Sequence, residues 1–134
     1  MPSTVIILAC AGLAGMVAGI LAFRANIRFQ NQGATPRTWS TLRVRVRVFG
    51  IFIGACSLPL TYWMGYPIDT PKGVGRIVGI PFFVAFFDSA GRDFVGPITM
   101  LGALGNCVFW FLLPQIVLFV YAYFWRKKNL NVLV

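Results

Sequence analysis

The amino-acid sequence predicts an all-α membrane protein with three transmembrane helices, at about residues 4–23, 46–64 and 98–125. Apolar residues make up 58% of the chain and charged residues only 11%, whereas charged residues are about 25% of a typical soluble domain. Three apolar runs have the length of about 17–25 residues that crosses the hydrocarbon core of a bilayer. We therefore expect the 134 residues to form a single integral membrane domain.

The first run, residues 4–23, ends at Arg24. No basic side chain precedes it and it is longer than the apolar region of a signal peptide, so we expect a retained helix. Ala11, Gly15 and Gly19 recur at intervals of four. Small residues with this spacing let two membrane helices approach closely, which predicts a packing face.

Residues 24–47 contain six arginines and no acid. The stretch 42–48 alternates apolar and basic residues, as an amphipathic strand would. We favour a helix that begins near Ser40, because Ser40 and Thr41 can cap one and an apolar span follows. Six basic residues near the spans are expected to reach lipid headgroups, namely Arg43, Arg45, Arg47, Arg126, Lys127 and Lys128.

The second span carries Gly50 and Gly54 as its small-residue face. After it, the 33-residue segment 65–97 is too long for a simple connector. Its apolar part, residues 77–87, is too short to cross a bilayer, so we expect a short interfacial helix there. Four phenylalanines of this part are expected to contact a partner or a ligand, namely Phe82, Phe83, Phe86 and Phe87.

The third span, residues 98–125, is the longest apolar run and ends at three basic residues. Gly102 is a further packing position, and Trp110 adds an aromatic surface. Asn106 and Gln115 are its polar side chains, each a candidate contact with a partner or ligand. They lie nine positions apart and face opposite sides of an ideal helix, so we expect one of them to face a partner or ligand.

The basic residues predict the orientation of the chain. All three acids lie in residues 65–97, balanced by three basic residues, while the other nine basic residues flank the opposite ends of the spans. Basic residues favour the cytoplasmic side. We therefore expect the N-terminus and the segment 65–97 to lie outside the membrane and the C-terminus to lie in the cytoplasm. The expected location is the inner membrane of a bacterium.

Several kinds of chemistry are disfavoured by the composition. The chain has no histidine, which removes the commonest metal ligand and proton shuttle. We find no nucleophile paired with a base, no ligand-spaced metal motif, and no Asp, Glu, Lys, Arg or His inside the apolar runs 4–23, 48–64 and 98–125, where ion and proton pathways usually have one. We expect no catalytic residue, no metal and no nucleic acid, because the basic residues flank apolar runs rather than a soluble face.

The expected function is that of a small, non-catalytic accessory subunit of a larger membrane complex, bioenergetic in type (photosynthetic or respiratory). It would dock through its small-residue faces and the phenylalanine-rich segment, with anionic lipids as further partners. No cofactor is expected on the chain alone, although contact with a carotenoid, quinone or chlorophyll could be shared with a partner. The alternatives are a binding module for a quinone, carotenoid or lipid, and a small channel or transporter.

Overall fold

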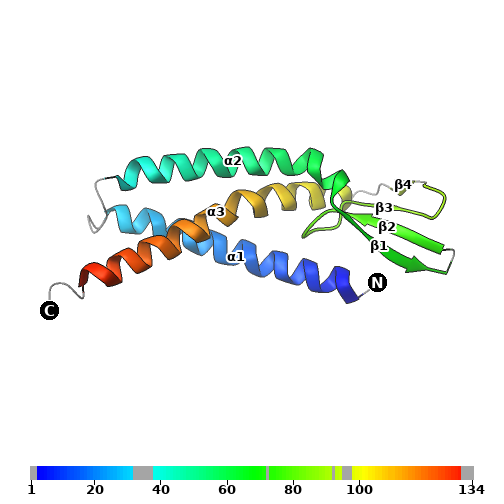
Figure 1. Cartoon of the computed structure of the whole chain (residues 1–134), viewed down its shortest axis with the longest axis horizontal. Coiled ribbons are helices and arrows are strands. Elements are labelled where there is room, and N and C mark those ends of the chain that lie inside the picture. The colour runs from blue at the N-terminus through cyan, green and yellow to red at the C-terminus, as the bar shows by residue number, and fades with distance from the viewer. Residues whose placement is uncertain (1–2, 32–37, 72, 92, 95–97, 131–134) are drawn as a thin grey trace.

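The computed structural model describes residues 3–31, 38–71, 73–91, 93–94 and 98–130. The described residues form three long helices and four short strands: α1 (Ser3–Asn31), α2 (Trp39–Trp63), β1 (Gly65–Thr70), β2 (Gly73–Val78), β3 (Ala85–Phe87), β4 (Asp93–Phe94) and α3 (Ile98–Leu130). The strands lie together at the end of the molecule where α1 begins, and the C-terminal end of α3 lies at the opposite end (Figure 1).

All three helices are long and apolar enough to cross a membrane. At most 22% of the apolar stretch of each helix is buried inside the chain, so most of this apolar surface is left for lipid or for another protein. The chain is therefore a multi-pass membrane protein. The helices α1 and α3 extend past the C-terminal ends of their expected spans, because no glycine or proline follows the apolar run closely enough to stop them. The helix α2 instead begins earlier than its expected span, at Trp39, and ends at Trp63, shortly before Gly65.

The third helix is the central one. Both α1 and α2 pack against α3 and hardly touch each other, and α3 crosses α1 near the middle of the molecule in Figure 1. Two different sides of α3 are consequently covered by the chain itself, whereas α1 and α2 each have one covered side.

The segment between α2 and α3 is a sheet, and the prediction of an interfacial helix at residues 77–87 is wrong. Four strands pair antiparallel in the order β1-β2-β3-β4. The register of the first pair runs from Gly65 opposite Val78 to Thr70 opposite Gly73. Residues 77–87 contribute the end of β2, a loop and all of β3. The end of β2 pairs with residues 65–66 of β1 and with β3, and β3 pairs in turn with β4, so these pairings satisfy backbone hydrogen bonds in place of a helix.

Residues 42–48, at the end of the molecule opposite the sheet, form a helix and not a strand. The helix α2 begins at Trp39, so residues 42–48 are helical. Trp39 is buried with Leu118 and Ala122 of α3 in a small core. The guanidinium of Arg47 lies 4.9 Å from the centre of the Phe23 ring, a cation–π contact that joins α2 to α1.

Candidate functional site

Residues 79–84, which connect β2 to β3, pack into the sheet end of the helices, and we call them the inserted loop. Gly79 has φ +107°, a conformation that side chains rarely adopt, and allows the chain to turn there. The Gly79 N–H donates to the carbonyl of Met64 at 3.0 Å, and the Val84 N–H donates to the carbonyl of Val78 at 2.9 Å. These bonds close the loop on the sheet and on the end of α2.

Three residues of α3, spaced one helical turn apart, hold the inserted loop, and we call them the clamp: Gly102, Asn106 and Trp110. The Asn106 side chain is fully buried. Its Oδ1 accepts a hydrogen bond from the Phe82 N–H at 2.8 Å, and its Nδ2 donates to the Phe82 carbonyl at 3.0 Å. Both polar groups of one loop residue are thus satisfied by one amide inside an apolar environment.

The other two clamp residues contact the loop on either side of Phe82. The Trp110 indole N–H donates to the Ile80 carbonyl at 3.1 Å. Gly102 lies against the Phe83 carbonyl oxygen, which a Cβ at that position would overlap. The i, i+4, i+8 spacing places the three clamp residues on one face of α3.

The inserted loop also contacts α1. A Cβ on Gly12 would lie 2.7 Å from Cγ of Pro81, closer than atoms can approach without displacement. The loop is therefore wedged between α1 and α3, and this fixes the sheet to the helices. Gly79, Pro81, Phe82 and Asn106 are therefore the residues of the sequence that form this arrangement.

Four of the expected packing glycines face α3 within the chain. Gly15 and Gly19 of α1 lie against the side chains of Phe109 and Leu112, and Gly50 and Gly54 of α2 lie against the backbone carbonyls of Phe111 and Cys107. Ala11, the remaining small residue, is exposed. The glycine faces of α1 and α2 are thus occupied by α3, and a partner would meet other surfaces.

Gln115 is also fully buried, at the contact between α1 and α3. Asn26 of α1 donates from Nδ2 to the backbone carbonyl of Gln115 at 3.1 Å. The two side-chain polar atoms of Gln115 and the Oδ1 of Asn26 have no hydrogen-bond partner among the described residues. Asn106 and Gln115 are both covered by this chain, because α3 is packed on two sides. Asn106 is satisfied by the inserted loop, and contact of Gln115 with a partner or ligand stays a prediction.

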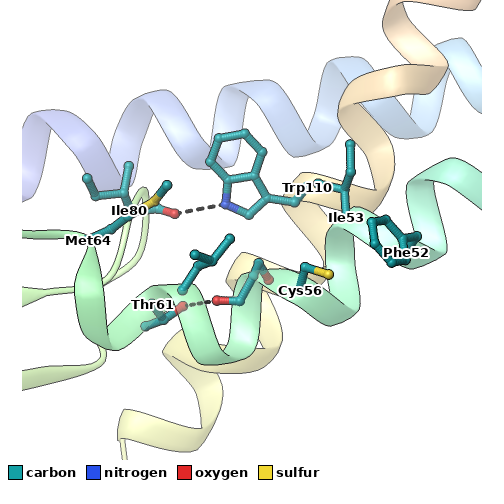
Figure 2. A pocket seen from close by; sticks show the side chains of 9 residues that line it. Phe52, Ile53, Cys56, Thr61, Met64, Ile80 and Trp110 are labelled. Carbon is teal, nitrogen blue, oxygen red and sulfur yellow. Dashed lines mark hydrogen bonds between the residues drawn. The ribbon is translucent and has the colours of Figure 1, made fainter.

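An apolar pocket of about 370 Å³ lies beside the clamp, between α2, Trp110 and Ile80. Figure 2 shows Phe52, Cys56 and Met64 around it. Its polar hydrogens are already used: the Ser57 and Thr61 hydroxyls donate to backbone carbonyls of α2, and the Trp110 N–H donates to Ile80. The strong side-chain donors among the described lining residues are thus committed, and the Cys56 thiol is only a weak donor.

The remaining expected site residues lie at the two ends of the molecule. Phe82, Phe83, Phe86 and Phe87 are half-buried in the inserted loop and β3. At the other end, Arg45, Arg126, Lys127 and Lys128 are exposed, and Arg43 and Arg47 are half-buried. The Arg126 guanidinium lies 5.8 Å from the Phe29 ring centre.

Sequence reasoning missed Asn26 and Trp39, because both lie in what was interpreted as a polar connection. Asn26 lies just beyond Arg24 among residues that form helices readily, and this composition favours continuation of α1. The three cysteines are free thiols, and no group of three possible metal ligands occurs in the described part of the chain. The sequence matches no family model and no curated protein, and the fold matches no solved structure.

Proposed function

We propose that this protein is a small, non-catalytic accessory subunit of a larger membrane complex. The observation that carries the proposal is the clamp, whose contacts with the inserted loop fix a small sheet on the end of the three helices. No catalytic group of side chains lies beside it among the described residues. A sheet held in this way suits a role in presenting a surface to another protein.

The exposed surfaces of the helices support this role. Large apolar side chains on the side of α1 that faces away from α3 include Leu13 and Val17, which are 54% and 58% exposed. The glycines of α1 and α2 are used inside the chain, so docking would involve these larger side chains and the sheet. Energy-converting complexes, photosynthetic or respiratory, in a bacterial inner membrane are the class in which we would look first.

The proposed orientation places the sheet outside and the C-terminus in the cytoplasm. The sheet end carries all three acids of the chain and the opposite end carries basic residues without acids. Because basic residues are retained on the cytoplasmic side, the sheet would meet a partner at the outer surface of the membrane.

The test is photo-crosslinking in native membranes. A photoreactive amino acid at Leu13 on α1, or at Val74 on the sheet, should give one discrete adduct with the same partner, identified by mass spectrometry. Val74 is 60% exposed, so substitution there does not disturb the fold. A matched control is the same residue at Phe124 of α3, 62% exposed near the opposite end, which should give a different pattern.

Mild detergent extraction followed by native electrophoresis gives an independent result. The proposal requires co-migration with a larger assembly. Migration as a lone chain of 14.8 kDa, together with the absence of adducts from both positions, would contradict it.

A second candidate function, sheltering an apolar ligand, is favoured by the pocket beside the clamp. Because its donors are committed, the pocket suits an acyl chain or a carotenoid better than a quinone, whose carbonyls need donors. Organic extraction of the purified protein tests this. A stoichiometric pigment or lipid that is lost on Cys56→Phe, which fills the pocket, and retained on Cys10→Phe, which alters an exposed thiol of α1, would support it.

A further inference from the structure

A second groove lies between α2 and α3 at the arginine end of the molecule. It has a volume of about 640 Å³ and is lined by apolar side chains from Leu42 to Ile53 on α2 and from Leu113 to Tyr121 on α3. At 1.5 Å per residue, the α2 side of the groove is about 16 Å long. One leaflet of a bilayer core is about 15 Å deep, so the groove runs from the level of the headgroups to the middle of the membrane.

Arginines stand at the open end of this groove. Arg45 is exposed and lies one helical turn from both Leu42 and Phe49, which line the groove. Arg43 has the same relation to Val46. Residues in these relations are neighbours on a helix surface, so the two guanidinium groups flank the mouth of the groove.

The charge at this end is not neutralised by the chain. Arg43 and Arg47 are like charges at i and i+4, which destabilise a helix, and every acid in the sequence lies in residues 65–97 at the other end. An anion bound between the arginines would convert this repulsion into attraction.

A buried donor without an acceptor lies next to a residue that lines the groove. Trp39 is 2% exposed and packs with Leu118, a residue that also lines the groove. The Trp39 indole Nε1 has no hydrogen-bond partner among the described residues. A buried unpaired donor is costly, so a phosphate or ester oxygen that displaces the side chains covering it would gain a hydrogen bond.

We propose that this groove is a binding site for one anionic phospholipid from the leaflet at the arginine end. An acyl chain fills the groove between α2 and α3, and the phosphate is bound by Arg45 and Arg43 near Trp39. The apolar length, the flanking charges and the unpaired donor are the properties that select this occupant. The proposal does not depend on the accessory role, because the isolated chain would have the site.

Native mass spectrometry of the purified full-length protein tests the proposal, with phosphatidylglycerol and phosphatidylcholine of identical acyl chains as probes. One phosphatidylglycerol should be retained per chain, more tightly than phosphatidylcholine. Arg45→Gln should weaken phosphatidylglycerol binding about fivefold, the effect of about 1 kcal/mol per basic residue near an anionic lipid. Arg28→Gln, which removes an exposed arginine of α1 at the same end, should have little effect.

A second pair of variants tests the groove itself. Val117 lines the groove and is 67% exposed, so Val117→Trp should fill it and abolish lipid retention. Val120→Trp changes an exposed residue of the same helix that does not line the groove, and should retain the lipid. Circular dichroism verifies that each variant keeps its helix content.

Three results would overturn the proposal. Equal binding of the two lipids would remove the role of the arginines. Equal losses in Arg45→Gln and Arg28→Gln, or in the two tryptophan variants, would show general surface attraction in place of a site. A dimer of this chain without bound lipid would show that a second copy occupies the groove.

Discussion

Replacing Asn106 by leucine should release the inserted loop. Leucine has the same number of side-chain heavy atoms and the same branching at Cγ as asparagine, and it suits a membrane helix. The change removes the two hydrogen bonds to Phe82, of 2.8 and 3.0 Å, and its bulkier methyl groups press on the same loop. The Phe82 N–H and carbonyl are then unpaired, and each unpaired buried group costs about 1–3 kcal/mol. Because Phe82 is only half-buried and regains some water, we expect a total loss of about 2–4 kcal/mol.

Hydrogen–deuterium exchange of the purified protein in detergent measures this loss at the affected site. A peptide covering residues 79–84 should exchange about 30-fold to several hundred-fold faster in Asn106→Leu, since 1.4 kcal/mol corresponds to a factor of ten. Peptides from the centres of α1 and α2 should be unchanged. A matched control is Leu104→Ala, whose side chain is 61% exposed on the same helix.

The clamp would be refuted by native-like protection of residues 79–84 in Asn106→Leu. It would equally be refuted if Leu104→Ala accelerated exchange of this peptide as much, because the effect would then come from a general weakening of α3.

Three other substitutions have expected outcomes that are measured by chemical unfolding in detergent. Gly102→Ala places a Cβ on the Phe83 carbonyl oxygen and should destabilise the protein by about 1–3 kcal/mol, as overpacking does; an unchanged midpoint would contradict the close contact. Trp110→Phe removes the bond to the Ile80 carbonyl and part of the ring that lines the pocket, and should cost about 1–2 kcal/mol, less than Asn106→Leu. Gln115→Leu removes two buried polar atoms without partners and should raise stability by about 1–3 kcal/mol, whereas a loss would indicate that a water molecule or ligand satisfies this amide.

The existence of the three helices could be predicted from the sequence because a long apolar run has one stable solution in a bilayer, a helix that satisfies its own backbone. The ends of the helices could not be predicted from apolarity. Residues 24–31 and 39–45 contain most of the polar and basic residues of α1 and α2 and are still helical. Helix formers continue beyond the hydrocarbon, and α1 ends at Asn31, shortly before the helix breakers Gly33 and Pro36 in the sequence.

The sheet was missed because its hydrogen bonds are not local. Residues 77–87 are apolar and contain Pro81, which suits a first helical turn as well as a loop. In a strand, Val74, Arg76 and Val78 would lie on one face and Gly75 and Ile77 on the other. The turn-forming sequence Pro71-Lys72-Gly73 comes directly before them. These features favour a hairpin, and the earlier strand that completes it lies directly after the second span.

The polar residues of the third helix show why a single-helix argument was insufficient. Asn106 and Gln115 do lie on different sides of α3, as their spacing requires. Opposite sides would indicate an external partner if α3 lay at the edge of the molecule. Because α3 is central, one side receives the inserted loop and the other receives Asn26 of α1, so the Asn106 amide serves the assembly of this chain, whereas Gln115 contributes its backbone carbonyl. The surfaces that remain for other molecules are therefore the outer sides of α1 and α2, the sheet, and the groove at the arginine end.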